Sequence, residues 1–109
     1  MVLVRNIFRL KFGTARAGIA ALKESIAVAP RLGHPGQFRL LNDVSGDFYT
    51  LVLEVTYPDL GAMEQTAAKV FGDPQWEAVY RTFVPLVESG RREIFTIVET
   101  ASPAHTGDT

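Results

Sequence analysis

The sequence predicts an α+β fold whose elements follow the order β-α-β-β-α-β. Three observations carry this prediction. Strand-like and helix-like segments alternate in that order, a short Ser45-Gly46 connection joins the two central strands, and the composition is globular, with 47% hydrophobic and 21% charged residues among 109. The order is that of the ferredoxin-like arrangement, a four-stranded antiparallel sheet with its helices on one face. We expect one domain over residues 1–99 and a flexible tail over residues 100–109.

The first strand and the first helix are expected from periodicity and from the residues that end them. Apolar and charged residues alternate from Leu3 to Phe12, and Gly13 ends the strand. Thr14 is a candidate N-cap for a helix over "ARAGIAALKESIAVA". Pro30 lacks a backbone N–H, so it ends this helix or bends its last turn.

The two central strands are expected at "QFRLLNDV" and "DFYTLVLEVTY". Ser45-Gly46 lies between them and predicts a tight antiparallel hairpin. Asp59 can cap the following helix, "LGAMEQTAAKVF", and Gly72 fits the residue just beyond its end.

A second helix start follows immediately at Asp73-Pro74, with Asp as the N-cap and Pro at the first helical position. Pro85 is expected to disturb the last turn of this helix, and Ser89-Gly90 to end it. The last strand is then expected at "RREIFTIVE".

Residue parity separates the two faces of the sheet, because alternate side chains of a strand point to opposite sides. The face that the helices cover is expected to hold Val4, Phe8, Leu10, Phe12, Phe38, Leu40, Val44, Tyr49, Leu51, Leu53, Val55 and Tyr57. The opposite face mixes apolar and charged residues, among them Ile7, Leu41, Phe48, Val52, Arg5, Arg9, Arg39, Asp43 and Glu54. The last strand has two candidate inward sets, Arg91/Glu93/Phe95/Ile97 and Arg92/Ile94/Thr96/Val98.

The mixed face predicts self-association rather than a bare, solvated surface. A solvated sheet face is usually more uniformly polar, so apolar side chains there indicate burial against a second copy through a two-fold axis. The candidate residues of this dimer face are Arg5, Arg9, Arg39 and Glu54. Ion pairs among them would fix the register of the two copies more than they would add stability.

Several segments resemble those of a known group of proteins. The stretches "PQWEAVYRTFVPLVESGRREIFTIVE", "FYTLVLEVTY" and "VLVRNIFRLKFG" resemble NIPSNAP-like proteins of the dimeric α/β-barrel superfamily. The resemblance spans residues 2–99 and rests on aromatic and apolar framework residues. It implies that two ferredoxin-like sheets pack face to face as a homodimer.

The candidate ligand-binding residues are Asn6, Tyr49, Trp76 and Tyr80. Parity places Asn6 on the helix-covered face, where a polar side chain either finds a local partner or lines a pocket. Trp76, Tyr80 and Phe83 follow helical spacing, which predicts a packing surface first and a ligand surface second. A polar-lined apolar cavity is the alternative to a filled core.

The superfamily resemblance also prompts a test for haem. In haem-degrading members the site combines an asparagine on the first strand, a tryptophan in the second helical region and a histidine ligand. Asn6 and Trp76 resemble the first two, but His34 lies in the loop "GHPG", where its ring is expected to be exposed, and His105 lies in the tail. Without an axial ligand, no haem is expected. No other cofactor and no metal is expected either, because no HExxH, GxSxG, P-loop or GxGxxG spacing occurs.

Charge and composition limit the classes of partner and the compartment that we expect for this protein. A net charge of −1 and the absence of a basic cluster disfavour nucleic acid. No membrane-spanning run is present, and the zero cysteines fit a reducing compartment, so a cytoplasmic protein is expected.

Two functional hypotheses remain. The first is a homodimeric small-molecule-binding or interaction module without a catalytic constellation, which is favoured because no acid–base pair is visible. The alternative is a cofactor-independent monooxygenase or isomerase acting on a small aromatic or apolar substrate in a pocket between sheet and helices.

Overall fold

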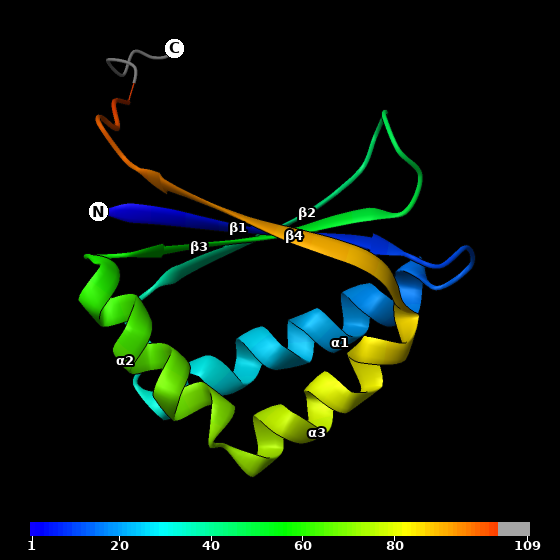
Figure 1. Cartoon of the computed structure of the whole chain (residues 1–109), viewed down its shortest axis with the longest axis horizontal. Helices are drawn as coiled ribbons and strands as arrows, with labels where there is room; N and C mark the ends of the chain where they lie inside the picture. The colour runs from blue at the N-terminus through cyan, green and yellow to red at the C-terminus, as the bar shows by residue number, and fades with distance from the viewer. Residues whose placement is uncertain (103–109) are drawn as a thin grey trace.

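A computed structural model describes residues 1–102 of the chain. Four strands and three helices follow in the predicted order, with two short 3-10 segments where the helices end at prolines (Figure 1). Their bounds are β1 Val2–Leu10, α1 Ala15–Val28, η1 Ala29–Leu32, β2 Gln37–Asn42, β3 Thr50–Tyr57, α2 Leu60–Phe71, α3 Pro74–Phe83, η2 Val84–Leu86 and β4 Val87–Thr96. Of the predicted flexible tail over 100–109, only the first three residues lie within the described range.

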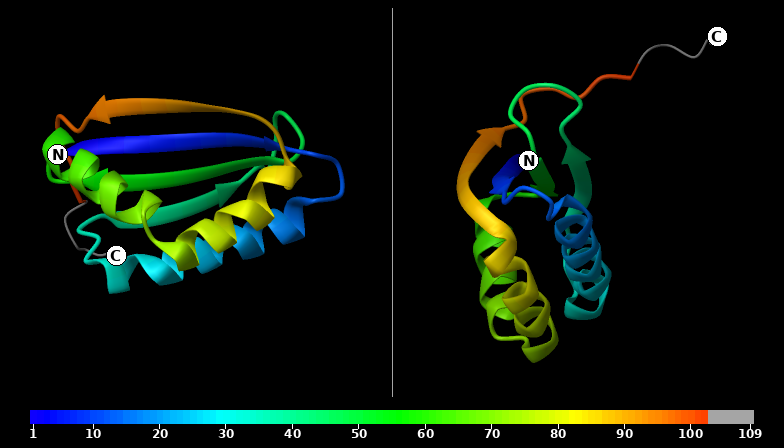
Figure 2. Two further views of the ribbon diagram at one scale, coloured as in Figure 1. Left: turned by 60° about the horizontal axis from the view of Figure 1, so that its bottom comes forward. Right: turned by 90° about the vertical axis from the view of Figure 1, so that its right-hand side faces the viewer.

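The four strands form one antiparallel sheet in the order β2-β3-β1-β4. All three helices lie on one face of it, below the sheet in Figure 1 and on the same side in both views of Figure 2. The predicted ferredoxin-like α+β fold is therefore confirmed. The opposite face of the sheet carries no helix in the part of the chain that the structure describes.

The parity assignment agrees with the observed register. Asn6 lies opposite Leu53 on β3 and opposite Arg92 on β4. The register also decides between the two candidate inward sets of the last strand. Arg92 and Ile94 lie on the helix side, and Arg91, Glu93 and Phe95 lie on the open side. Two predicted inward residues, Phe12 and Val44, instead lie beyond the ends of β1 and β2 and are exposed. Parity no longer applies there, since the chain has left the sheet.

The hairpin between β2 and β3 is longer than predicted. β2 ends earlier than predicted, at Asn42, and β3 begins later, at Thr50. Residues 43–49 between them form a loop that rises on the open side of the sheet (Figure 1). Asp43 closes this loop, because its carboxylate accepts a hydrogen bond from the Thr50 N–H (3.0 Å) and its own N–H donates to the Thr50 carbonyl (3.1 Å). Tyr49 and Gly46 have positive φ values, 60° and 95°, which a continuing strand does not allow.

The prediction that Ser89-Gly90 ends a helix was wrong, since both residues lie inside β4. Pairing with β1 decides this, with Ser89 opposite Arg9 and Gly90 opposite Phe8. A Cβ atom on Gly90 would lie 3.4 Å from the Phe8 ring, an ordinary van der Waals contact, so the strand continues through this residue without strain.

Local sequence explains most helix ends. Asp59 and Asp73 cap α2 and α3 as predicted, accepting hydrogen bonds from the N–H groups of Ala62 (2.7 Å) and Trp76 (2.8 Å). Thr14 precedes α1, but its hydroxyl turns back and donates to the Lys11 carbonyl (2.6 Å) instead of capping the helix.

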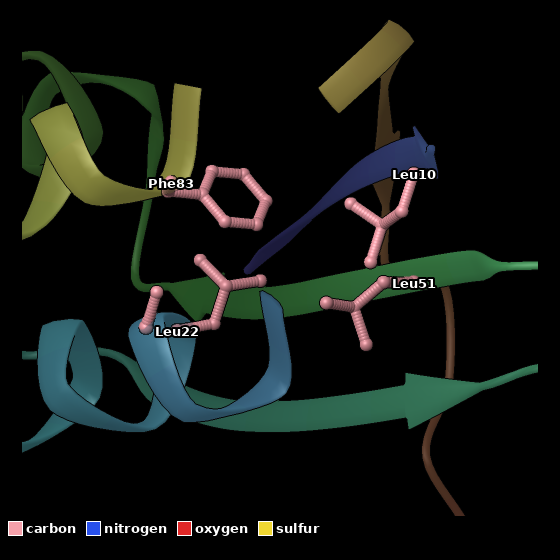
Figure 3. Close-up of a cluster of buried hydrophobic side chains, with 5 residues drawn as sticks. Leu10, Leu22, Leu51 and Phe83 are labelled. Carbon is pink, nitrogen blue, oxygen red and sulfur yellow. The ribbon is translucent and has the colours of Figure 1, made fainter. Parts of the chain in front are cut away.

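One cluster of the buried core lies where α1 and α3 meet the end of β1 and the start of β3. Leu22 of α1 and Phe83 of α3 meet Leu10 and Leu51 of the sheet (Figure 3). Leu51 is 1% exposed and Phe83 is 3% exposed. Phe83 also meets Phe8 edge-to-face at 4.9 Å between ring centroids. Side chains fill the interface around Leu10 and Leu51, so any space for a ligand lies beyond Leu22 and Phe83 toward its other end.

Candidate ligand-binding site

A cavity of about 340 Å³ separates the helices from part of the sheet. Its volume is within the range typical of small-molecule sites, about 300–1,000 Å³. Most of its wall is apolar, contributed by all three helices and by all four strands. The lining residues that carry a polar side-chain group are Asn6, Ser25, His34, Tyr57, Thr66, Trp76, Tyr80 and Arg92.

Trp76 is held in place at the start of α3. Its backbone N–H donates to Asp73, and its indole N–H donates to the Ser25 hydroxyl on α1 (3.1 Å). Its ring stacks on Tyr80 at 5.0 Å between centroids and an interplanar angle of 16°. A tryptophan fixed on both sides in this way presents a rigid wall to the cavity.

Asp73 secures this corner of the molecule. Its carboxylate accepts two hydrogen bonds from Arg31, at 2.9 and 3.0 Å, in addition to the bond from the Trp76 N–H. The backbone hydrogen bond from Trp76 and the nearby Arg31 guanidinium hold the pKa of this carboxyl below its usual range. Asp73 thus links η1 to α3 at the edge of the cavity.

The aromatic stripe of α3 divides between the two expected roles. Phe83 is buried in the core and also touches the cavity, whereas Tyr80 is 49% exposed and lies with Trp76 at the cavity. The helix turns this stripe along its length from the filled end of the interface toward the open end. Packing and cavity lining are therefore both present on one helix face.

Asn6 lies in the floor of the cavity, at the centre of the sheet. Within residues 1–102, its side chain makes no hydrogen bond to another protein group. Arg92 lies beside it on β4 and forms no ion pair with any carboxylate in that range. An amide and a guanidinium on neighbouring strands can together bind the oxygen atoms of a ligand.

Tyr49, the remaining candidate, does not line the cavity. Its ring packs on Phe12 at 4.9 Å, at the far end of the sheet. Parity assigned Tyr49 and Tyr57 to one face but said nothing of distance along the strand. The length of β3 separates them, roughly 25 Å at the usual rise per residue.

His34 and Tyr57 form a polar pair in the cavity wall that sequence reasoning did not single out. The ring of His34 is partly buried, not exposed as expected, and packs on Phe38 at 4.6 Å between centroids. Its Nε2 lies 3.2 Å from the Tyr57 hydroxyl, and its Nδ1 accepts the N–H of Gly36 (2.9 Å). Burial lowers the pKa of His34 and raises the pKa of Tyr57, so both side chains are neutral at pH 7. The sequence offers only a weak signal for this pair: His34 lies shortly before β2, and the neighbouring strand β3 ends at Tyr57.

The lining limits the chemistry of the cavity. Its titratable side chains are His34, Tyr57, Tyr80 and Arg92, and no carboxylate is among them. Within residues 1–102, moreover, no three His, Cys, Asp or Glu side chains come together as a metal site would require. The described arrangement can bind and polarise a ligand through hydrogen bonds, and its only imidazole, that of His34, has a pKa lowered by burial.

The four candidate dimer-face residues lie on the open side of the sheet. Glu54 is 6% exposed and is held between Arg5 (3.0 Å) and Arg39 (2.9 Å). Arg9 contacts Asp47 of the hairpin loop at 3.4 Å. Three of the four thus pair with one another across neighbouring strands of the same chain.

Solved structures with the same arrangement are found among NIPSNAP-domain proteins. An uncharacterised NIPSNAP domain protein from Burkholderia xenovorans superposes with a TM-score of 0.81 at 17% identity, covering 94% of this chain and 99% of its own. A NIPSNAP family protein from Agrobacterium tumefaciens gives the same TM-score at 18% identity, covering 94% and 97%. This chain has their fold. No protein-family model and no curated protein matches its sequence.

A second group shares the fold at lower similarity. The cofactor-independent oxygenase SnoaB from Streptomyces nogalater superposes with a TM-score of 0.69 at 19% identity, covering 91% of this chain and 94% of its own. At these identities the likeness concerns the fold.

No helix within residues 1–102 is both long enough and apolar enough to cross a membrane.

Proposed function

We propose that the protein is a homodimeric module, built from one domain over residues 1–99, that binds a small apolar or aromatic molecule between its sheet and helices. One observation carries the proposal: a largely apolar cavity of about 340 Å³ touches both Asn6 and Trp76. A filled core at this position would leave no room for a ligand. An apolar wall with a few fixed polar groups is the usual composition of a small-molecule site.

The binding test uses the single tryptophan of the chain as a reporter. Acetylnaphthalene, a flat aromatic ketone, should quench Trp76 fluorescence with saturation, because the indole lies in the cavity wall. Ala67→Phe should weaken binding at least tenfold, because Ala67 lines the cavity and the added ring would occupy it. Ala68→Phe is the matched control, since Ala68, the next residue on α2, is exposed and does not line the cavity. Equal quenching of both variants would refute binding in this cavity.

The dimer is supported by the open face of the sheet. Leu41, Phe48 and Phe95 expose 37%, 68% and 48% of their surface, beside the ion pairs of Glu54. A groove of about 460 Å³ runs along this face next to the hairpin loop. An apolar surface that lies on a twisted sheet and alternates with paired charges suits a second copy of itself through a two-fold axis.

Sedimentation velocity tests the dimer directly. The sedimentation profile of the wild-type protein should give a mass of twice the 12.0 kDa of the chain. Leu41→Glu should shift it toward monomer by placing a charge in the interface, while Leu60→Glu, at an exposed site on α2, should not. A wild-type monomer at high concentration would exclude the arrangement.

Cofactor-independent monooxygenation or isomerisation is the second candidate. The fold shared with SnoaB and the placement of Asn6 and Trp76 at one cavity favour it. In such an oxygenation the substrate supplies the electrons: a methylene becomes a carbonyl, and the second oxygen atom of O₂ leaves as water. Oxygen uptake with hydroxylated aromatic compounds, in metal-free buffer, should then depend on Asn6, and Asn6→Ala should abolish it. Binding without turnover would leave the non-catalytic module.

We place the protein in the cytoplasm. A chain with 109 residues and no cysteine fits a reducing compartment. Fractionation of cells that express it from its own gene should recover it with cytoplasmic markers.

A further inference from the structure

The Tyr57 hydroxyl is a hydrogen-bond donor without an acceptor inside the described part of the protein. Its one hydrogen-bonding partner within residues 1–102 is the Nε2 atom of His34, at 3.2 Å. A phenol can both accept and donate. The direction of this bond therefore decides which capacity is left over, and that direction follows from the other nitrogen of the ring.

The backbone of Gly36 sets the tautomer of His34. Its N–H points at Nδ1 at 2.9 Å, so Nδ1 must hold a lone pair. A neutral imidazole then carries its single hydrogen on Nε2, which donates it to the Tyr57 oxygen. The hydroxyl hydrogen of Tyr57 cannot be directed back at this N–H and is left for another acceptor.

The surroundings hold this arrangement in place. The His34 ring packs against Phe38 and against the Tyr57 ring, whose centroid is 5.1 Å away. A Cβ atom on Gly36 would lie 2.6 Å from the Thr56 carbonyl oxygen, so the turn fits closely against β3. Both rings belong to the wall of the cavity. Burial raises the pKa of Tyr57, which keeps the phenol protonated and able to donate.

We propose that His34 positions the Tyr57 hydroxyl as an obligate hydrogen-bond donor to an acceptor oxygen, a carbonyl of a flat apolar ligand, bound in the cavity between sheet and helices. This rests on the proposed function, since it names the chemistry that the same cavity selects. A ligand of equal shape without the oxygen would leave a partly buried donor unpaired. Selectivity for the carbonyl compound is therefore the property that Tyr57 confers, and His34 acts through it.

The test compares two flat ligands that differ in that oxygen, acetylnaphthalene and isopropenylnaphthalene, in which C=CH₂ replaces C=O, by calorimetric titration. The wild-type protein should prefer the ketone by about fivefold, the value of one net hydrogen bond. Tyr57→Phe should remove the preference by weakening ketone binding while hydrocarbon binding is retained. Tyr49→Phe is the matched control, because this tyrosine lies outside the cavity, and its preference should equal that of the wild type.

A second variant examines the positioning role of His34. His34→Leu keeps the phenol but removes the donor that orients it, so the preference should fall to an intermediate value. A change of stability alone would shift both affinities together and leave their ratio unaltered. Loss of the preference in Tyr57→Phe with an unaltered ratio in His34→Leu would overturn the positioning role.

The outcomes separate this inference from the proposed function. If the wild type binds both compounds equally, the cavity is a binding site and the donor role of Tyr57 is refuted. The same holds if Tyr57→Phe keeps the full preference. If the wild type binds neither compound and Trp76 fluorescence is unchanged, both proposals fail.

Discussion

Truncation of the aromatic stripe on α3 tests how the helix sits on the sheet. Phe83→Ala removes a ring that is 3% exposed and packs edge-to-face on Phe8. Large aromatic truncations in a core cost about 3–5 kcal/mol. A domain of 109 residues has an unfolding entropy of about 0.23 kcal/mol/K near its midpoint, so each kcal/mol lowers Tm by about 4 °C. We expect Tm to fall by about 13–22 °C in differential scanning calorimetry.

Tyr80→Ala is the matched comparison on the same helix face. This ring is 49% exposed and its main contact is the stack on Trp76. An aromatic pair of this kind contributes about 0.5–1.5 kcal/mol beyond area burial, so a loss of about 1–2 kcal/mol, or roughly 4–8 °C, is expected. Both variants must be compared at one protein concentration, because association shifts apparent stability. Equal losses, or a greater loss for Tyr80→Ala, would refute the division of the stripe into a buried end at Phe83 and an exposed end at Tyr80.

Three further outcomes follow from the cavity wall and its edge. Asp73→Ala should unfold at a lower urea concentration than Asp73→Asn, since asparagine still caps α3. The wild type should be more stable than Asp73→Asn above about pH 5, and this difference in stability should shrink toward pH 2, because the folded-state pKa of the Asp73 carboxyl is lowered. Burial lowers the pKa of His34, so its stabilising contribution is complete above its ordinary pKa of about 6.5 and is lost as the pH falls through the folded value. Urea midpoints should therefore fall more for wild type than for His34→Gln between about pH 7 and pH 5, and a parallel decline would contradict this. Gly36→Ala should destabilise by about 1–3 kcal/mol, because its Cβ would lie 2.6 Å from the Thr56 carbonyl oxygen; Gly72→Ala, with no contact closer than 3.6 Å, should change stability by less than about 0.5 kcal/mol, as measured by chemical denaturation.

Local signals in the sequence accounted for most of the elements. Asp59 and Asp73 mark helix starts because a carboxylate in these positions binds free N–H groups of the first turn. The same reasoning failed at Ser89-Gly90, where local preference for a break yields to pairing with β1. It failed again in the β2–β3 loop, whose length is set where the Asp43 carboxylate meets the Thr50 N–H.

The candidate site shows the same division. Helical spacing and parity brought Asn6, Trp76 and Tyr80 to the correct layer, and the structure places all three at one cavity. Parity also selected Tyr49, because alternation reports which face a residue occupies but not how far along the strand it lies. His34 was set aside as a loop residue, since nothing in "GHPG" shows that the loop folds back on the end of β3.

The sequence by itself determined the order of the elements, the two faces of the sheet and the residues that begin two of its helices. These properties depend on neighbours along the chain and on periodicities of two and 3.6 residues, which are readable in one dimension. Only the tertiary structure decided that side chains fill the interface around Leu10 and Leu51 while a cavity remains between the helices and the rest of the sheet, and that His34 and Tyr57 meet in its wall. Those features depend on side-chain volumes and distances between segments 23 residues or more apart, which no local pattern specifies.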